Sequence, residues 1–530
     1  MAKRRKLLGS ECTITSTAAR VLPGSPIDDD GDARAILTLD ALRTLERRHA
    51  ALPLMERAGL AAAGVALAMT GRAPAHVVVL AGPGNNGGDA CVVARHLHEG
   101  GRTVEVLGRP AAAGLAAEAA RAWAAMRAAG VREVDRLPAG PPALIVDGLF
   151  GIGLARPIAD PWARWIEWAN DSGAPILALD VPSGLDAATG AARAPTIDAT
   201  HTATFIALKP GLLTCDGPDH CGAISVHGLG LDDVAAARAG IRLTWPALAA
   251  DLPEVLARRR RATHKGTFGT VVVAGGAEGM VGAAFLAARS ALALGAGRVV
   301  VELMARDGPR FDPVTPELMV SEVPVDDAQA QVIGPGLGRS AHAAAVLASA
   351  IARDVPLVLD ADALNLVAEA ASGDGPGMAD ASLAAAIARR RAATVLTPHP
   401  AEAARLLGCD TASVQADRVA AAATLARRFQ ATAILKGAGT IVAYPGGGFD
   451  VNATGNPALS TAGSGDVLSG MLGALLAQRV GAPEAARIAV CLHGAAADAL
   501  VAGGIGPVGV RASEVIEKAR ALVNAASRRT

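Results

Sequence analysis

Residues 456–471 read NPALSTAGSGDVLSGM, and at their centre three small residues, Gly463-Ser464-Gly465, precede the acid Asp466. Apolar residues then recur at helical spacing, so the pattern predicts a loop that enters the N-terminus of a helix. The first turn of a helix leaves backbone N–H groups unpaired and carries partial positive charge, which suits a phosphate group. Because a glycine-rich turn before a helix is as often a plain cap, the neighbouring motifs decide between the two interpretations.

Four further loops precede this stretch, and each follows an apolar run of strand length. They are GPGLG (334–338), LDADALN (359–365), LTPHPAE (396–402) and LKGAGT (435–440). The carboxyl ends of parallel strands share one edge of a sheet, so we expect these loops to converge. Lys436 and the loop amides would neutralise phosphate charge there, with Asp466 as the base, which predicts a nucleotide site. A lone histidine is more often structural, but His399 lies at the same edge, and we expect it to contact the substrate.

The composition limits the classes of function. A chain of 530 residues is too long for one ordinary core, and its 51% hydrophobic content argues against disorder. A formal net charge of zero and 2% aromatic residues argue against a nucleic-acid-binding surface. Six scattered cysteines are no disulfide framework, and no apolar run reaches the ~18 to 20 residues that span a bilayer. We expect a cytoplasmic α/β protein without nucleic-acid or membrane partners, whose alanine-rich helix faces favour a homo-oligomer.

Changes in composition along the chain predict the domain boundaries. Residues 1–34 contain a basic and an acidic run and have the composition of a poorly ordered extension. A helical, basic connection from Asp233 to Ala262 ends in four arginines and separates two α/β halves. We therefore expect the extension at 1–34, a first domain at 35–235, a linker at 236–261 and a second domain at 262–530.

The first half of the chain repeats a pattern of strand, polar loop and helix. The apolar run 76–80 is followed at once by AGPGNNGGD (81–89) and an apolar helix. Two later apolar runs of strand length end in acids, Asp147 and Asp180. Because parallel strands end at one edge, these acids should converge with the loop 81–89 on one crevice. The pattern predicts an open α/β sheet with a ligand site at this edge.

The same crevice offers oxygen ligands for a hard cation. Asn86, Asp147 and Ser183 supply an amide, a carboxylate and a hydroxyl group. Because only one of these three groups is charged, a monovalent ion fits the set as readily as magnesium does. The residues alone leave that choice open.

Taken together, the motifs resemble those of two enzyme families. Residues 37–232 resemble the NAD(P)H-hydrate epimerase domain, through LME (54–56), AGPGNNGGDA (81–90), DGLFGIGLARP (147–157) and LDVPSGLDAATG (179–190). Residues 262–524 resemble the nucleotide-dependent NAD(P)H-hydrate dehydratase domain, a ribokinase-like family. The matching stretches are HKGTFGTVVVAGG, GPGLG, LDADALN, LTPHPAEAARLLG, LKGAGT and NATGNPALSTAGSGDVLSGM. The resemblance implies an N-terminal Rossmann-like three-layer αβα domain followed by a C-terminal ribokinase-like α/β domain.

The resemblance implies repair of NADH and NADPH that have taken up water across a ring double bond. The first domain would interconvert the R and S hydrates (NADHX and NADPHX), with K⁺ bound. The second would dehydrate the S form at the expense of ADP or ATP with Mg²⁺. Hydroxide is a poor leaving group at neutral pH, whereas phosphate is a good one. We therefore expect a phosphorylated intermediate, with Asp466 as the base and Lys436 stabilising charge.

The resemblance also implies roles for individual residues. Hydrate binding in the first domain falls to Asn85, Asn86, Gly87, Gly88, Asp89, Gly151, Ile152, Gly153, Leu154, Ala155, Arg156, Pro157 and Asp180. Potassium binding falls to Asn86, Asp147 and Ser183. Hydrate contacts in the second domain fall to Ala283, Gly336, His399 and Asp466. Nucleotide binding falls to Lys436, Gly437, Ala438, Gly439, Thr440, Asn456, Gly463, Ser464 and Gly465.

Proton transfer has two candidate residues in the first domain. Asp180 is our candidate catalytic group there. Lys209 is a candidate acid, although a lysine in a loop is more often solvated.

Two other functions stay open at this point. Residues 262–524 fit a small-molecule kinase of the same superfamily, because a phosphorylated product would need the same glycine-rich loop. Residues 37–232 fit a non-catalytic module that senses nucleotides. Fold alone does not decide either case.

Overall fold

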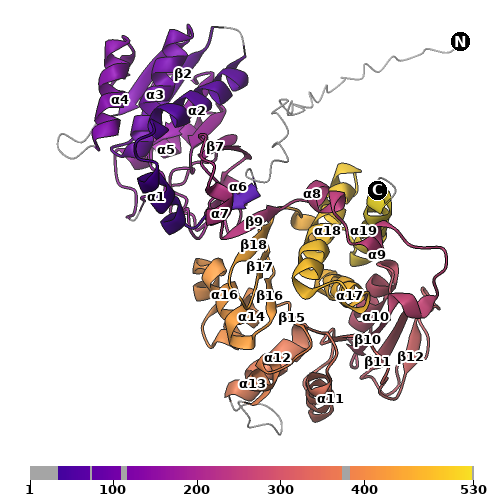
Figure 1. The fold of residues 1–530 in the computed structure, drawn as a ribbon. Helices are drawn as coiled ribbons and strands as arrows, with labels where there is room; N and C mark the ends of the chain where they lie inside the picture. The colour runs from indigo at the N-terminus through magenta and orange to yellow at the C-terminus, as the bar shows by residue number, and fades with distance from the viewer. Residues whose placement is uncertain (1–33, 72–73, 109–115, 155, 373–381, 528–530) are drawn as a thin grey trace, which may run out of the picture.

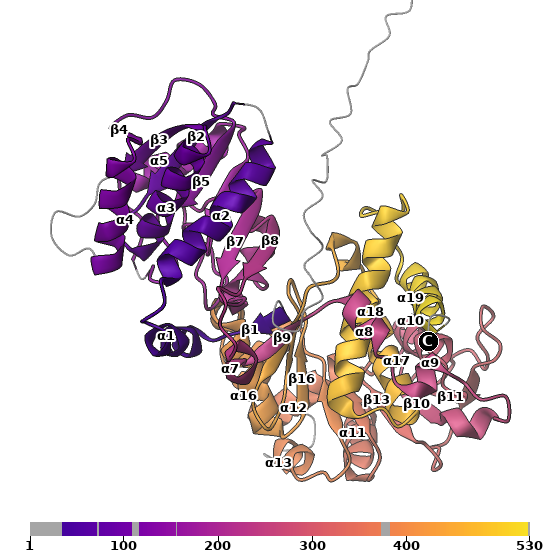
Figure 2. The same cartoon turned by 45° about the horizontal axis from the view of Figure 1, so that its top comes forward.

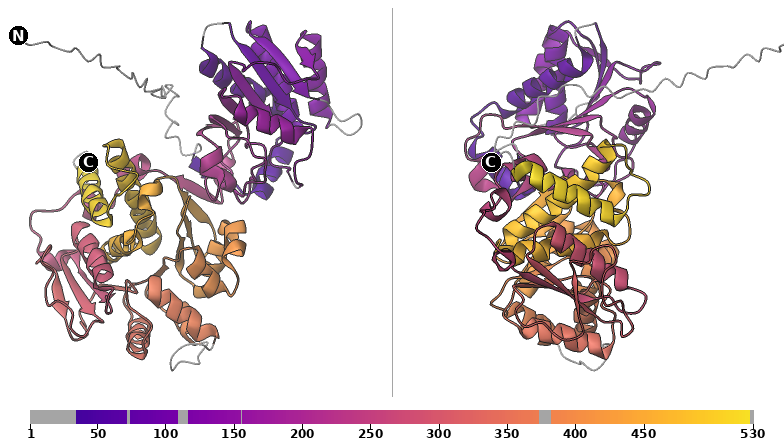
Figure 3. Two further views of the ribbon diagram at one scale, coloured as in Figure 1. Left: turned by 180° about the vertical axis from the view of Figure 1, so that it is seen from behind. Right: turned by 90° about the vertical axis from the view of Figure 1, so that its right-hand side faces the viewer.

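The computed structural model describes residues 34–71, 74–108, 116–154, 156–372 and 382–527 (Figure 1). The chain forms two α/β bodies, one coloured indigo to magenta and the other mainly rose to yellow (Figure 1). They remain distinct from behind and from the side (Figure 3). The expected extension, residues 1–34, lies outside the described residues apart from its last position.

The first body is built on a seven-stranded sheet in the described part of the chain, with the order β4-β3-β2-β5-β6-β7-β8. All neighbouring pairs are parallel, and the central strands are continuous apolar runs because both faces are covered. The strands are β2 (His76–Ala81), β3 (Thr103–Gly108), β4 (Arg132–Val134), β5 (Leu144–Gly148), β6 (Ile176–Leu179), β7 (His201–Phe205) and β8 (Ala223–His227).

Helices cover both faces of this sheet. One face packs against α2 (Leu54–Thr70), α3 (Asn85–Glu99) and α4 (Ala117–Ala128). The other packs against α5 (Trp162–Asp171). The three layers and the reversal of strand order between β2 and β5 confirm the predicted Rossmann-like αβα domain.

The second body is built on an eleven-stranded sheet among the described residues, in the order β1-β9-β18-β17-β16-β15-β14-β13-β10-β11-β12. Its parallel strands are β10 (Thr270–Gly275), β11 (Arg298–Leu303), β12 (Met319–Ser321), β13 (Ala330–Ile333), β14 (Leu357–Leu359), β15 (Thr394–Leu396) and β16 (Thr432–Leu435). The antiparallel strands β17 (Ile441–Ala443) and β18 (Phe449–Asn452) follow β16.

Two layers of helices enclose this sheet. One layer contains α10 (Val281–Ala293), α17 (Ser464–Ala477), α18 (Ala482–Ala502) and α19 (Ala512–Ser527). The other contains α11 (Ala341–Ala352), α12 (Ala361–Ser372), α13 (Ser382–Ala388), α14 (Pro400–Leu407), α15 (Thr411–Ala416) and α16 (Arg418–Phe429). This arrangement agrees with the expected ribokinase-like α/β fold. Helix α18 is long and apolar enough to cross a membrane, but 72% of its apolar window is buried inside the molecule.

The segment from Asp233 to Ala262 is not the purely helical connection that the sequence predicts. It contains strand β9 (Gly240–Leu243) between the short helices α7 (Val234–Ala237), α8 (Trp245–Ala250) and α9 (Glu254–Ala257). Strand β9 pairs with β18, and Asp450 Oδ1 accepts a hydrogen bond from Ile241 N at 2.9 Å. Residues 240–243 are therefore a strand because they pair with β18, which lies much later in the chain. Local propensity does not reveal such a pairing.

Strand β1 (Ala35–Ile36) joins the two bodies at this edge. It pairs antiparallel with β9, and it precedes α1 (Leu39–Arg48) of the first body (Figure 2). Leu208 of the first body bonds to the same strand, since its N–H group donates to the Ala35 carbonyl oxygen at 3.1 Å. Backbone hydrogen bonds thus run from the first domain into the second sheet.

Candidate active sites

The first domain has a cavity of about 610 Å³ beside the point where the strand order reverses between β2 and β5. In open α/β sheets, ligands bind at this switch point, beyond the carboxyl ends of the strands. Many of the expected hydrate-binding residues line it: Asn85, Asn86, Asp89, Gly151, Ile152, Gly153, Leu154 and Asp180. Arg156 and Pro157 are exposed and do not line it, and Ala155 lies outside the described residues.

Gly87 and Gly88 are buried in α3 and do not line the cavity. A Cβ atom on Gly87 would lie 1.9 Å from the carbonyl oxygen of Gly82, and one on Gly88 would lie 2.7 Å from Met55 Sδ. Both glycines therefore allow α3 to pack closely against the loop before it and against α2. This packing places Asn85 and Asn86 at the cavity wall.

A buried ion pair lies at the cavity wall, formed by Asp180 after β6 and Lys209 after β7. Lys209 is 1% exposed, and its Nζ donates to Asp180 Oδ1, to Thr204 Oγ1 at 2.9 Å and to the Phe205 carbonyl at 2.9 Å. A buried ammonium group needs such partners, because burial without them is costly. A lysine in a loop is usually solvated, but Lys209 is buried.

Two further acids, Glu46 and Asp89, line the same cavity. Burial raises the pKa of both carboxyl groups, and the nearby charge of Asp180 raises them further. The cavity thus combines the carboxyl group of Asp180, bonded to Lys209, with two carboxyl groups that retain their protons more readily. Sequence reasoning missed Glu46, because helix α1 reaches the site only through the tertiary fold.

Asp147 and Ser183 bond to each other beneath the cavity wall, and Asn86 lies against the loop after Asp147, where a Cβ atom on Gly151 would lie 3.5 Å from Asn86 Cγ. Ser183 Oγ donates to Asp147 Oδ1 at 2.6 Å, and Ser183 N donates to Asp147 Oδ2 at 2.8 Å. Burial raises the pKa of Asp147 to about 6. Asn86 is 7% exposed, and within the described part of the chain neither polar atom of its side chain has a hydrogen-bond partner. The unpaired amide oxygen of Asn86, the Asp147 carboxylate and the Ser183 hydroxyl group are donors that fit a hard cation.

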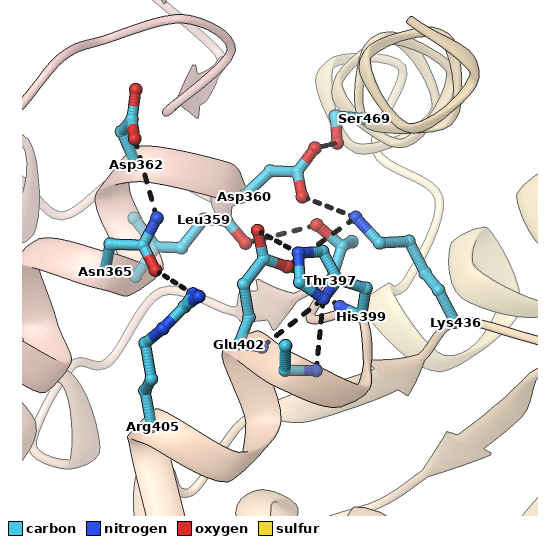
Figure 4. A network of polar contacts seen from close by, with 11 residues as sticks. Leu359, Asp360, Asp362, Asn365, Thr397, His399, Glu402, Arg405, Lys436 and Ser469 are labelled. Atoms are coloured by element: carbon cyan, nitrogen blue, oxygen red, sulfur yellow. Dashed lines mark hydrogen bonds and ion pairs between the residues drawn. The ribbon is translucent and has the colours of Figure 1, made fainter. Parts of the chain in front are cut away.

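In the second domain, Lys436 at the end of β16 is the centre of a polar network (Figure 4). Its Nζ lies 2.8 Å from Asp360 Oδ1 and 4.0 Å from Glu402 Oε2. Ser469 Oγ of α17 donates to Asp360 Oδ2 at 2.7 Å. Burial opposes the charge on Lys436, but the carboxylates of Asp360 and Glu402 outweigh it and raise the pKa of the ammonium group. Lys436 therefore stays a cation at the end of the sheet.

Asp466 lies in the first turn of α17, after Gly463 at φ 86°. Burial raises the pKa of this carboxyl group to about 7, and the Asp360 carboxylate adds to that effect while Lys436 opposes it. A Cβ atom on Gly465 would lie 3.3 Å from Lys436 Nζ. The glycine turn, the lysine and the acid therefore converge, as the sequence predicts.

Close packing of α17 against α10 sets the position of this turn. A Cβ atom on Gly470 would lie 2.0 Å from the Ala287 carbonyl oxygen, so only glycine allows the two helices to approach so closely. Ser290 Oγ donates to the Val467 carbonyl at 2.7 Å. The small residues of this stretch thus serve helix packing as well as the turn.

Of the expected hydrate contacts of the second domain, Gly336 follows β13 and His399 follows β15, whereas Ala283 and Asp466 lie in α10 and α17. A Cβ atom on Gly336 would lie 3.2 Å from the Cβ atom of Ala283, at the switch point between β10 and β13. His399 caps α14: its Nδ1 accepts from Ala401 N at 3.1 Å, and its Nε2 lies 3.2 Å from Glu402 Oε1. Burial and the charge of Lys436 lower the pKa of His399, so its imidazole is neutral.

The other expected nucleotide-binding residues form two turns. Gly437, Ala438, Gly439 and Thr440 connect β16 to β17. In the second turn, Asn456 Nδ2 donates to Asp498 Oδ1 at 2.8 Å, and Ser464 Oγ donates to the Leu459 carbonyl at 2.8 Å. These side chains shape the turns through internal hydrogen bonds. Asp498 is a residue that no sequence signal singled out.

Sequence reasoning also missed three residues of the network around Lys436, namely its partners Asp360 and Glu402, and Ser469, which bonds to Asp360. Two of them have a signal that could have found them. Asp360 ends a strand in LDADALN, and Glu402 follows His399 by three residues, which is the spacing of a capping box. Ser469 has none, because only the packing of α17 over β14 brings it to Asp360.

Comparison with known proteins identifies both halves of the chain. Residues 51–211 match the family model of the YjeF-related protein N-terminus, and residues 271–519 match that of NAD(P)H-hydrate dehydratase. A solved ADP/ATP-dependent NAD(P)H-hydrate dehydratase of Bacillus subtilis, crystallised with ATP and Mg²⁺, is 28% identical. It covers 53% of this chain and 97% of that one, with a TM-score of 0.45.

Curated relatives match nearly the whole length of the chain. A bifunctional NAD(P)H-hydrate repair enzyme of Leishmania major is 40% identical over 507 residues, which cover 89% of each chain. One of Escherichia coli K12 is 39% identical over 458 residues, which cover 85% of each chain. With this identity across both domains, the protein belongs to the family of bifunctional NAD(P)H-hydrate repair enzymes.

Proposed function

We propose that this chain repairs hydrated NADH and NADPH in two steps, epimerisation in the first domain and ADP-dependent dehydration in the second. The observation that carries the proposal is Asp466, a partly buried acid with a pKa near 7 that lies close to Lys436 in a glycine-rich turn. A carboxyl group whose pKa is near neutral pH can remove a proton from a hydroxyl group, and a cation beside it stabilises the charge that develops in phosphoryl transfer.

In the second domain, the hydroxyl group of the S hydrate gives its proton to Asp466 while its oxygen attacks the terminal phosphoryl group. The bond from that phosphorus to the nucleotide oxygen breaks, and Lys436 stabilises the charge that develops. Phosphate then leaves from its carbon, the neighbouring ring carbon loses a proton to water, and the ring double bond is restored. Mg²⁺ bound with the nucleotide would neutralise phosphate charge, and Asp360 and Glu402 offer carboxylates of the kind it prefers.

In the first domain, the carbon that carries the added hydroxyl group is bonded to the ring nitrogen. Asp180 takes the hydroxyl proton, the carbon–nitrogen bond breaks to give an aldehyde, and the nitrogen takes a proton from Glu46 or Asp89. The aldehyde group then rotates, and the nitrogen attacks the other face of its carbonyl carbon. Closure of the ring with return of the two protons gives the other epimer. Within the described residues, the hydrogen bonds to Asp180 reach Oδ1, so Oδ2 is left to accept that proton.

An absorbance assay at the NADH band tests the proposal. Purified protein with the S hydrate and ADP should regenerate absorbance and release phosphate, and omission of the nucleotide should stop both. With the R hydrate, regeneration should continue through the first domain. Release of a stable phosphate ester without NADH would indicate a kinase instead.

The epimerase should depend on potassium, because Asn86, Asp147 and Ser183 supply oxygen atoms of the kind that a hard cation prefers. K⁺ there would hold the Asn86 side chain and thereby the loop that lines the cavity. We expect epimerisation to fall at least severalfold when KCl is replaced by tetramethylammonium chloride at equal ionic strength. Asn86→Leu should abolish the difference between the two salts, and an equal response of the variant and the parent would contradict the site.

Dehydration should depend on pH through Asp466. A carboxyl group is an active base only when deprotonated, and the pKa of about 7 places that change within the neutral range. We expect kcat/KM for the hydrate to rise about tenfold per pH unit below pH 7 and to level off above it. A profile that is flat between pH 6 and 8, measured at saturating ADP, would remove Asp466 as the base.

The expected homo-oligomer and the cytoplasmic location stay predictions. Size-exclusion chromatography with light scattering tests the first.

A further inference from the structure

The first domain contacts the proposed nucleotide-binding turn of the second domain directly. Beyond Lys209, the short helix η2 (Pro210–Leu212) leads to Thr214, which is completely buried. Its hydroxyl group donates to two carbonyl oxygens, that of Ala438 at 3.2 Å and that of Gly439 at 3.1 Å. Both carbonyl groups belong to the turn between β16 and β17.

Arg418 of α16 completes this contact from the second domain. It is 1% exposed, its Nε donates to Thr214 Oγ1 at 2.9 Å, and its Nη2 donates to the carbonyls of Leu435 at 3.3 Å and Lys436 at 3.2 Å. A buried guanidinium group is costly unless its donors are satisfied. One side chain thus joins the end of β16, which carries Lys436, to a threonine of the first domain.

The glycines of the turn lie directly against this contact. Gly439 has φ 60°, and a Cβ atom on it would lie 1.9 Å from the Leu213 carbonyl oxygen. A Cβ atom on Gly437 would lie 2.9 Å from Arg418 Nη1. The glycines therefore allow residues 213–214 and Arg418 to lie directly behind the turn.

The contact fixes the direction of the amide groups of the turn. In a trans peptide the C=O and N–H groups point in opposite directions. Holding the carbonyls of Ala438 and Gly439 toward Thr214 therefore points the N–H groups of Gly439 and Thr440 away from it. Among the described residues, no hydrogen-bond acceptor is found for the backbone N–H groups of 437–440, and the turn is partly exposed. Such N–H groups are suited to bind phosphate oxygens.

We propose that Thr214 of the epimerase domain is a positioning residue for nucleotide binding in the dehydratase domain. It holds the turn 437–440 from behind, so that the dehydratase site is complete only with the first domain in place. The inference rests on the proposed nucleotide-binding role of that turn.

Thr214→Val removes the hydroxyl group and keeps the shape, so it tests the inference in the full-length chain. We expect KM for ADP to rise about three- to tenfold, as for the loss of a buried hydrogen bond, with kcat at saturating ADP within twofold of the parent. Thr214→Ser should restore the parent KM. Epimerisation of the R hydrate should stay unchanged in both variants.

Thr202→Val is the matched control. Thr202 is equally buried in the first domain, but its Oγ1 donates to Cys221 O at 2.7 Å and makes no contact with the turn. It should leave KM for ADP unchanged, whereas an equal rise in both variants would mean a general loss of stability and would contradict the positioning role.

The experiment distinguishes failure of the proposed function from failure of the inference about Thr214. If the parent protein dehydrates nothing with ADP, the proposed function fails. If it does so but Thr214→Val keeps the parent KM, only the present inference fails. Should the variant not fold, hydrogen exchange of the parent decides instead: ADP should slow exchange in residues 211–216 of the first domain, and unchanged exchange there would overturn the inference.

Discussion

Asp466→Asn is expected to lower ADP-dependent dehydration by about 10²- to 10⁴-fold, which is the usual contribution of a positioned general base. The amide keeps the size of the carboxyl group but cannot accept the hydroxyl proton of the hydrate. ADP should still bind, because Lys436 and the N–H groups of the two turns are unchanged. The measurement is the rate of NADH regeneration from the S hydrate, with ADP binding followed by calorimetry.

Asp410→Asn controls for the loss of one carboxylate. Asp410 caps α15 through Ser413 N at 2.7 Å, and asparagine caps a helix equally well. This variant should dehydrate at the parent rate. Full dehydration by Asp466→Asn would exclude the mechanism, whereas loss of ADP binding would assign Asp466 to nucleotide binding instead.

Asp180→Asn is expected to lower epimerisation by a similar factor, about 10²- to 10⁴-fold, because the hydroxyl proton of the hydrate loses its acceptor. Lys209 stays buried beside Thr204 and the Phe205 carbonyl, so part of its hydrogen bonding survives. With the pure R hydrate and ADP, the variant should regenerate NADH no faster than spontaneous epimerisation supplies the S form.

The second domain serves as the internal control for that variant. Dehydration of the pure S hydrate should proceed at the parent rate, because the Asp466 site lies in the other domain. If R and S hydrates are consumed as fast as by the parent protein, Asp180 is not the base. A module that only senses nucleotides would show no epimerisation in the parent protein either.

Much of both sites could be predicted because strand ends are local features of a sequence. An apolar run that ends in a polar residue places that residue at the edge of a parallel sheet, wherever the strand lies in the order. This rule found Asp147, Asp180 and Lys436, and the glycine turn before a helix found Asp466. The resemblance then named the family and the two folds; the comparisons confirm the family, and the structure confirms the folds.

The remaining residues could not be predicted from such patterns. Glu46 comes from a helix that precedes the first sheet, and Lys209 is buried only because Thr204 and Asp180 surround its amine. Gly87 and Gly88 belong to a motif expected to bind hydrate, but they serve helix packing. In each case the partner lies on another element, so no local pattern contains the contact.

The sequence by itself determined the two α/β domains, their order, and the chemical groups at their strand ends, because apolar periodicity and turn residues act over a few neighbouring positions. Only the tertiary structure decided that β1 and β9 extend the second sheet, and that Thr214 of one domain supports the nucleotide turn of the other. Those contacts join residues 200 or more positions apart. Their energy depends on burial and hydrogen bonding between surfaces that exist only after both domains have folded.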